Sequence, residues 1–208
     1  MGNYEQLNVQ QMGSESDPFT ESRYKQFYRY FPPHVESVLD IGCNTGRGGR
    51  VLKQLRPSLS LTALDVVQNR LDRLPVEVYS HLICASATEI PGQDNQYDVV
   101  VAGEFIEHLY PSDVDKTLAE IFRVLKIGGL LLLTTPNPLD IKRRMKQRSI
   151  LGGAHVSQHF PDALRFKLRM IGYSNIRIRG SGKVSRFLGC GFPFLGLYGS
   201  YLAAAEKY

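Results

Sequence analysis

Residues 37–49 read Ser-Val-Leu-Asp-Ile-Gly-Cys-Asn-Thr-Gly-Arg-Gly-Gly, and this stretch decides the fold. It starts with a short apolar run that contains Asp40, and closely spaced glycines follow. Val51, Leu52 and Leu55 come next at helical spacing. This order predicts a buried parallel strand, a tight turn and a helix whose first turn points at a ligand.

The spacing of the glycines distinguishes two kinds of nucleotide site. A dinucleotide fingerprint has the form G-x-G-x-x-G, whereas Asp40, Gly42 and Gly46 give the form D-x-G-x-x-x-G. A pyrophosphate is an anion and binds bare N–H groups, away from a carboxylate. Asp40 at the mouth of the turn would attract a cation instead. A ligand that carries an ammonium and a sulfonium would fit such a site.

A second carboxylate, Asp65, follows the glycine turn at a sequence separation that is typical of ribose-binding acidic residues. The next predicted strand ends at Asp65, 23 positions after Gly42. An acidic residue near this offset accepts hydrogen bonds from the ribose hydroxyls of an adenosine-bearing ligand, and these bonds are charge-assisted. We therefore expect Asp65 to bind a ribose.

The remaining chain alternates short apolar runs with segments of helical periodicity. Residues 112–115 predict a capping box at the start of one helix. The other expected elements are strands at residues 59–64, 79–84, 97–102, 130–134, 175–179 and 201–206, and helices at residues 21–31 and 161–172.

The length of 208 residues, with 43% hydrophobic and 22% charged side chains, suits one globular domain. We expect it to cover residues 21–208, after a mobile polar tail over residues 1–20. The sequence has no long apolar run and no apolar leader, which predicts a cytoplasmic protein without a transmembrane segment. Cys43, Cys84 and Cys190 lack metal-binding spacing and are expected to be buried thiols.

Positive charge is concentrated in one part of the chain. Residues 139–186 contain 12 Lys or Arg and 2 Asp or Glu, and residues 142–148 are the densest part. A basic surface of this kind attracts nucleic acid, anionic lipid or an acidic substrate; the simpler interpretation is a solvated face beside the site. Residues 187–198 mix glycine and aromatics and either cover a sheet edge, line an acceptor pocket or contact a membrane surface.

Together, these residues resemble the motifs of the class I S-adenosylmethionine-dependent methyltransferases. The resemblance extends over residues 35–206, includes the strings VLKIGG and LLLLTTPNP, and is greatest to the type 11 group with quinone-pathway and sugar- or lipid-tailoring enzymes. It implies an α/β, Rossmann-like fold with a seven-stranded, mostly parallel sheet. The implied strand order is 3-2-1-4-5-7-6, with strand 7 antiparallel and helices on both faces.

The resemblance also implies S-adenosylmethionine as the cofactor. Family members often carry an acidic residue for the adenine amino group where this chain has Ser86. The residues that the resemblance places at the cofactor are Asp40, Gly42, Cys43, Asn44, Gly46, Asp65, Val66, Ser86, Ala87 and Gly103.

Glu104, Glu107 and His108 follow the central strand, where open α/β sheets bind ligands. We expect them to be catalytic, with His108 as the base, since imidazole titrates near neutral pH. A structural role for His108 is the alternative. The resulting expectation is methyl transfer to a small-molecule acceptor at oxygen, of the quinone, lipid or sugar type, without a metal.

Two other functions remain open. Glu104, Glu107, His108 and a later histidine, in the segment from His155 to His159, resemble the divalent-metal set of the small-RNA 2′-O-methyltransferases. The basic half of the chain agrees with RNA binding. The other alternative is a cofactor-binding subunit without activity of its own, which the intact acidic motif residues argue against.

Overall fold

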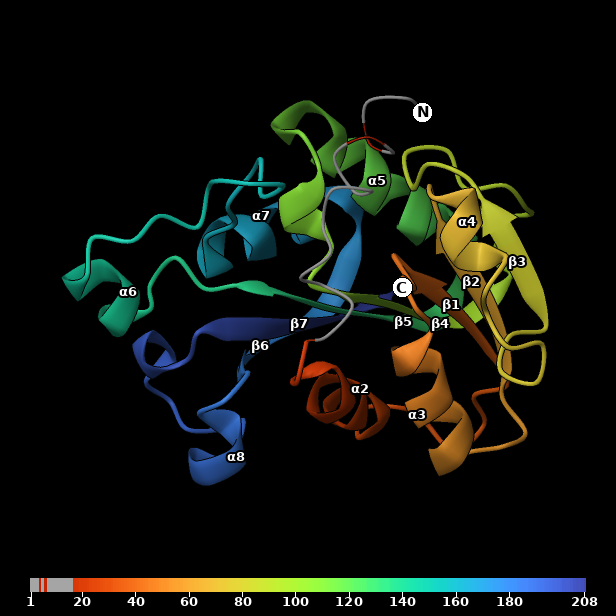
Figure 1. Ribbon diagram of the computed structural model, residues 1–208, viewed down its shortest axis with the longest axis horizontal. Helices are drawn as coiled ribbons and strands as arrows, with labels where there is room; N and C mark the ends of the chain where they lie inside the picture. Colours follow the sequence, from red (N-terminus) through yellow and green to blue (C-terminus); the bar gives the residue numbers. More distant parts are fainter. Residues whose placement is uncertain (1–3, 5, 7–16) are drawn as a thin grey trace.

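A seven-stranded sheet in the order β3-β2-β1-β4-β5-β7-β6 forms the centre of the computed structural model, which describes Tyr4, Gln6 and residues 17–208 (Figure 1). The strands are β1 (Ser37–Ile41), β2 (Ser60–Asp65), β3 (His81–Cys84), β4 (Tyr97–Gly103), β5 (Leu125–Pro136), β6 (Tyr173–Ser181) and β7 (Ser200–Lys207). Strand β7 is antiparallel to both of its neighbours, and the other pairs are parallel. The expected order and the antiparallel last strand are confirmed.

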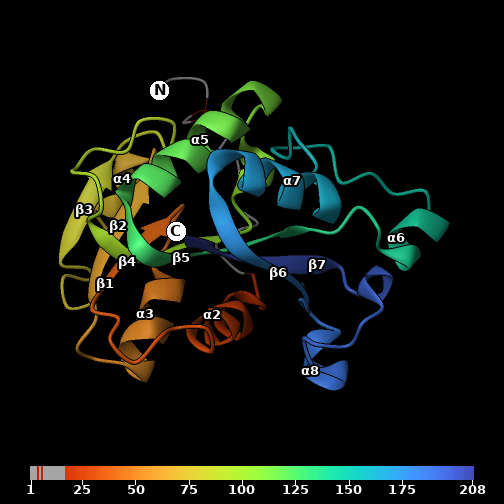
Figure 2. The same cartoon turned by 180° about the vertical axis from the view of Figure 1, so that it is seen from behind.

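Helices cover both faces of the sheet, with α2 and α3 on one face and α5 and α7 on the other (Figures 1 and 2). None of the helices among the described residues is long and apolar enough to cross a membrane. The helices are α2 (Thr20–Tyr28), α3 (Arg47–Leu55), α4 (Gln68–Leu71), α5 (Pro111–Val124), α6 (Ile141–Met145), α7 (Pro161–Ile171) and α8 (Ser185–Leu188), and two short 3-10 helices are η2 (Ile106–His108) and η3 (Leu195–Leu197).

The central strands are apolar on both faces because both faces are covered. In β4, Val99 and Val101 point to the layer of α2 and α3, whereas Val100 and Ala102 point to the layer of α5 and α7. Successive side chains of a strand alternate between faces, so a strand buried on both sides is a continuous apolar run. The same alternation holds for β5 over residues 130–133.

Some expectations need correction. The capping box at residues 112–115 is wrong, because α5 already begins at Pro111 and its N-cap, Tyr110, makes no side-chain cap bond. Proline suits the first position of a helix, since its missing N–H would have no partner there. The expectation of buried cysteines holds for Cys43 but not for Cys84, which is exposed on the edge strand β3, nor for Cys190, which is half-buried.

The predicted mobile tail, residues 1–20, falls mostly on residues 1–3, 5 and 7–16, which lie outside the described residues. Where the chain is described, Tyr4 donates a hydrogen bond to Asp113, and Asp17 pairs with Arg23 at 3.0 Å.

Helix α3 packs against α2 through a glycine. A Cβ atom added at Gly48 would lie 2.0 Å from Cζ of Tyr24. We expect Gly48→Ala to lower the free energy of unfolding in urea by about 1–3 kcal/mol, because the ring must move from a fully packed position. Gly191→Ala is the matched control, since an added Cβ there meets nothing within 4 Å. Equal unfolding midpoints of the two variants would contradict this packing.

Candidate functional site

A cavity of about 580 Å³ lies at the carboxyl ends of the parallel strands. Its walls come from the loops after β1, β2, β3 and β4, from the start of α2, and from the ends of β6 and β7. Its volume falls within the range of about 300–1,000 Å³ typical of small-molecule sites. The position is the one at which open α/β sheets bind ligands.

The turn after β1 requires glycine. Gly42 has φ +67° and Gly46 has φ +71°, both in the left-handed region. The N–H of Gly42 donates to the carbonyl of Leu64 at 2.8 Å, which ties the turn to β2. A Cβ at Gly42 would lie 2.9 Å from the ring of Phe105. Gly46 is the N-cap of α3 and has no side chain with which to cap the helix, and the first helical residues, Arg47 and Gly48, line the cavity.

Asp65 lines the cavity and is held by backbone groups. Its Oδ2 accepts from the N–H of Asn44 at 3.1 Å, and its Oδ1 accepts from the N–H of Val67 at 3.0 Å. Nη1 of Arg70 lies 3.8 Å from Oδ1. A carboxylate has about four acceptor positions, so the two backbone donors fix its orientation and leave capacity for the hydroxyls of a ligand.

Asp40 does not line the cavity, contrary to the expectation that it meets a cation directly. It is fully buried, and its two oxygens accept hydrogen bonds from Tyr24 and Tyr79, each at 2.6 Å. Burial raises the pKa of Asp40 to about 6, although the two hydroxyl donors lower it in part. The charge of Asp65 raises it further. Asp40 therefore supports the wall of the cavity from behind.

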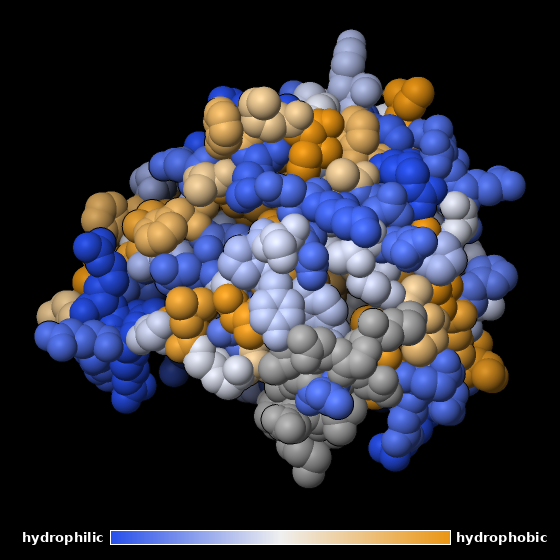
Figure 3. Space-filling view, turned by 90° about the horizontal axis from the view of Figure 1, so that it is seen from above, coloured by the Kyte–Doolittle hydropathy of each residue, from blue (hydrophilic) through white to orange (hydrophobic). Residues whose placement is uncertain are grey.

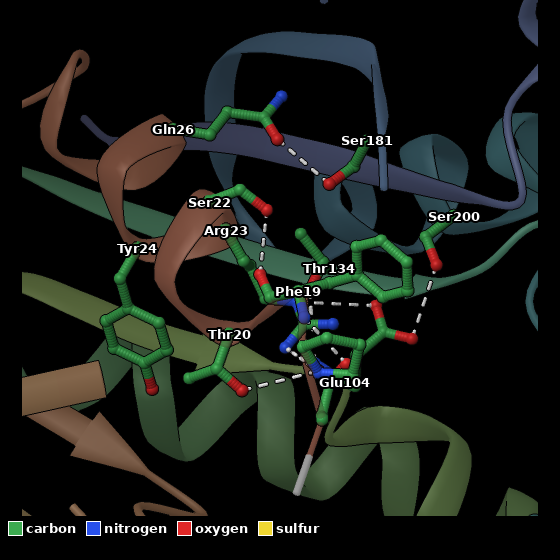
Figure 4. A network of polar contacts seen from close by, with 12 residues as sticks. Phe19, Thr20, Ser22, Arg23, Tyr24, Gln26, Glu104, Thr134, Ser181 and Ser200 are labelled. Atoms are coloured by element: carbon green, nitrogen blue, oxygen red, sulfur yellow. Dashed lines mark hydrogen bonds and ion pairs between the residues drawn. The ribbon is translucent and has the colours of Figure 1, made fainter. Parts of the chain in front are cut away.

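A paired cation and anion lie at the α2 side of the cavity (Figure 4). Nε of Arg23 is 3.8 Å from Glu104, and its Nη1 is 3.0 Å from Asp17. Glu104 also accepts from Ser200 at 3.3 Å, and its φ of +52° is a strained value that the N–H bonds to Thr134 hold in place. Arg23 was not predicted, because nothing in the spacing of the α2 residues distinguishes it.

Glu107 and His108, both from η2, also line the cavity. Glu107 is fully buried and accepts from Thr135 at 3.1 Å. Burial, together with the charge of Glu104, raises the pKa of Glu107 well above its usual range. His108 donates from Nδ1 to the carbonyl of Ala154 at 3.0 Å, since a carbonyl can only accept. Burial lowers the pKa of His108 to about 4, so its ring is neutral at pH 7.

Glu107, His108 and His155 could together hold a divalent cation. One oxygen of Glu107 and one nitrogen each of His108 and His155 lie within 4.8 Å of one another. His155, like His108, has its Nδ1 on a backbone carbonyl, at 3.2 Å, which is how metal-ligating histidines are commonly oriented. Glu104, which the resemblance also placed in the metal set, is not part of this cluster and lies beside Arg23 and Ser200.

The later histidine His159 is used structurally. Its Nε2 lies 2.9 Å from the hydroxyl of Ser157 and 3.1 Å from the carbonyl of Ile106. The segment that follows the basic cluster is thereby fastened to η2.

Most of the predicted site residues meet in the one cavity. Asp40 and Gly46 are exceptions, since Asp40 is covered and Gly46 shapes the start of α3. The predicted residues that line the cavity are Gly42, Cys43, Asn44, Asp65, Val66, Ser86, Ala87, Gly103, Glu104, Glu107 and His108. Sequence reasoning missed Arg23, Arg70 and the bond between Tyr79 and Asp40.

Comparisons with known proteins identify methyltransferases among the relatives of this chain. A family described as "Methyltransferase domain" matches residues 39–133. The chain is 32% identical over 135 residues to a malonyl-[acyl-carrier protein] O-methyltransferase of Laribacter hongkongensis, covering 58% of this chain and 44% of that enzyme. The chain therefore spans less than half of the length of that relative.

Two further comparisons cover more of the chain. It is 26% identical over 198 residues to phthiotriol/phenolphthiotriol dimycocerosates methyltransferase 1 of Mycobacterium ulcerans, covering 78% of this chain and 71% of the relative. The crystal structure of a SAM dependent methyltransferase from Archaeoglobus fulgidus superposes with a TM-score of 0.69 at 21% identity, over 90% of this chain and 92% of that one. This likeness extends the common fold beyond residues 39–133.

The raised pKa of Asp40 makes stability depend on pH. The folded protein keeps this proton up to about pH 6, whereas the unfolded chain releases it near 3.8. The stability contribution is therefore fully present below pH 3.8 and is lost as the pH rises through 6, by about 3 kcal/mol in total. We expect the free energy of unfolding of the natural chain, relative to Asp40→Asn, to fall between pH 4 and pH 7 in urea titrations.

The exposed Asp162→Asn variant is the matched control for that series. A difference between the natural chain and Asp40→Asn that stays constant from pH 4 to pH 7 would contradict the burial of Asp40.

Proposed function

We propose that this chain, which belongs to the class I S-adenosylmethionine-dependent methyltransferases, transfers a methyl group to an oxygen atom of a small-molecule acceptor of the quinone, lipid or sugar type. The observation that carries the proposal is the convergence of the glycine turn, Asp65 and Glu104 on one cavity. Oxygen as the acceptor atom is supported by a relative named as a malonyl-[acyl-carrier protein] O-methyltransferase. A small-molecule acceptor is supported by relatives named as a phthiotriol/phenolphthiotriol dimycocerosates methyltransferase and a ubiquinone/menaquinone biosynthesis C-methyltransferase.

The residues of the cavity fit S-adenosylmethionine. Asp65 has acceptor capacity left for the ribose hydroxyls, and Ser86, which also lines the cavity, would contact the adenine. The amino-acid end of the cofactor is a zwitterion, and the pair of Arg23 and Glu104 offers a cation and an anion in one wall. These residues would therefore hold the cofactor.

The cofactor supplies an activated methyl group on a positively charged sulfur. The task of the chain is to align the acceptor, and holding two reactants in line contributes on the order of 7–11 kcal/mol to lowering the barrier. His108 is the candidate base. Because its Nδ1 carries the proton toward Ala154, its Nε2 is the atom that can accept a proton from an acceptor hydroxyl.

The low pKa of His108 limits the rate enhancement that it can provide as a general base. A base whose conjugate acid has a pKa of about 4 is ready in its neutral form at pH 7 but is weak. It therefore suits an acceptor hydroxyl that becomes acidic as the methyl group is transferred. We therefore expect His108 to raise the rate by a factor at the lower end of the usual range for a general base, which is about 10²–10⁴-fold.

A second candidate function is RNA 2′-O-methylation with a metal ion. It is favoured by the cluster of Glu107, His108 and His155, whose ligand atoms lie within 4.8 Å of one another. This function requires that a chelator abolish activity and that binding of a short RNA fall steeply with salt. A third alternative, a cofactor-binding subunit without activity, requires that the isolated chain bind S-adenosylhomocysteine and transfer no methyl group.

The role of Asp65 can be tested by binding. Asp65→Asn removes the charge that strengthens the hydrogen bonds to the ribose, so we expect the affinity for S-adenosylhomocysteine in calorimetry to fall about 10- to 100-fold. Asp162→Asn is the matched control, because Asp162 is exposed on α7. Equal affinities for the two variants, with unchanged thermal unfolding, would remove Asp65 from the cofactor site.

The role of His108 can be tested by turnover. With labelled S-adenosylmethionine and a panel of quinol, sugar and lipid hydroxyls, we expect His108→Gln to lower kcat by about 10²-fold. The natural chain should lose activity near pH 4, not near 6.5, because burial lowers the pKa of His108 to about 4. His34→Gln is the control, since His34 is exposed. Unchanged turnover of His108→Gln at saturating acceptor would exclude it as the base.

A further inference from the structure

Two segments extend from the sheet at the end where the cavity lies. Together they form one lobe, which we define as residues 139–151 and 183–198. It contains α6, α8 and η3, and both Figures 1 and 2 show α6 and α8 at the same end of the molecule. The side-chain amide of Asn137 donates to the carbonyls of Leu195 and Tyr198, each at 2.9 Å. The two segments are thereby fastened together at their base.

The lobe exposes large apolar side chains. Scattered exposed apolar residues are normal on a soluble surface, but a gathering of them marks an interaction site. Phe187 and Met145 are each 80% exposed. The other large apolar side chains exposed on the lobe are Leu151, Leu188, Phe192 and Phe194.

The same lobe also carries a strong excess of basic residues. Among the residues of the lobe, all of which are described, Asp140 is the one acidic residue, and its Oδ1 already accepts from the N–H of Lys142 at the start of α6. Figure 3 shows strongly hydrophilic and hydrophobic side chains side by side at the end that carries α6. The exposed basic residues of the lobe are Lys142, Arg144, Lys146, Arg148, Lys183 and Arg186.

This combination favours one occupant. Exposed aromatic rings beside Lys and Arg are the pattern of a protein surface that contacts the headgroups and outer acyl region of an anionic bilayer. Protein–protein interfaces are depleted in lysine, and single-stranded RNA needs a basic groove with a row of stacking rings. On this lobe four of the six exposed cations lie on α6 or directly after it, whereas Phe187 lies on α8 near the other two, and Phe192 and Phe194 lie on the segment after α8.

We propose that the lobe docks on the surface of an anionic lipid bilayer, with Phe187, Phe192 and Phe194 in the interface and the basic residues on the headgroups. The cavity lies beside this contact, because Gly182 and Ser200, at the base of the lobe, are among its lining residues. Resting on the proposed function, the docking deepens it: the acceptor is a hydroxyl-bearing lipid or lipid-soluble molecule taken from the bilayer.

Co-sedimentation of the full chain with vesicles tests whether the basic residues of the lobe contribute to bilayer binding. We expect binding to mixed phosphatidylcholine–phosphatidylglycerol vesicles, weakening as salt is added, and none to phosphatidylcholine alone. Lys142→Gln with Arg144→Gln should lower the affinity about 25-fold, since each cation near such a surface contributes about fivefold. Lys116→Gln with Arg73→Gln removes the same charges from exposed positions outside the lobe and should bind like the natural chain.

A second pair of variants tests whether the exposed phenylalanines of the lobe contribute to bilayer binding. Phe187→Ser with Phe194→Ser should lower vesicle affinity about tenfold, because two rings no longer enter the interface. Val76→Ser with Ile127→Ser is the matched control, since both side chains are highly exposed elsewhere.

Several outcomes would overturn the docking. They are no sedimentation with anionic vesicles, equal binding by the lobe variants and their controls, a dimer in light scattering that the phenylalanine variants abolish, or RNA binding that the charge variants abolish in a chain that ignores vesicles. Calorimetry with S-adenosylhomocysteine separates the two proposals. Cofactor binding without vesicle binding overturns the docking and leaves the proposed function standing. Vesicle binding without cofactor binding overturns the proposed function, and with it the acceptor inferred here, and leaves the docking itself standing.

Discussion

The burial of the Asp40 carboxylate is the constraint on which the site depends. A buried charge is costly unless hydrogen bonds replace its water, and here Tyr24 and Tyr79 each donate one at 2.6 Å. The two tyrosines come from different elements, so the carboxylate joins α2 and the loop before β3 to the end of β1. Gly48 and Gly49 allow this, because an added Cβ would lie 2.0 Å from the Tyr24 ring and 2.3 Å from the Tyr79 hydroxyl.

This junction also places the polar groups of the cavity. Because Tyr24 is fixed on Asp40, the neighbouring Arg23 is held at the cavity wall, where it lies 3.8 Å from Glu104. Gly103 is part of the same packing, since an added Cβ would lie 2.9 Å from Cδ of Arg23. One buried carboxylate behind the wall thus determines which charges face a ligand in front of it.

The positions of the strands and of the cavity-facing loops could be predicted from local patterns, whereas the order of the strands was implied by the family resemblance. Apolar runs and glycine spacing predicted β1 and β4 closely, and Asp65 was predicted from its distance to Gly42. The orientation of Asp40 could not be predicted, since it depends on two tyrosines 16 and 39 positions away. Arg23 was missed for the same reason: its partners are brought to it by tertiary packing.

The position of β7 has a consequence for how the chain is made. It lies between β5 and β6, although it is synthesised after both. While the ribosome is still elongating the chain, β6 has no strand to pair with, and the outer side of β5 stays open until residues 200–207 emerge. Strand β6 therefore joins the sheet only through β7, and the last two strands are added to β5 in the reverse of their order of synthesis.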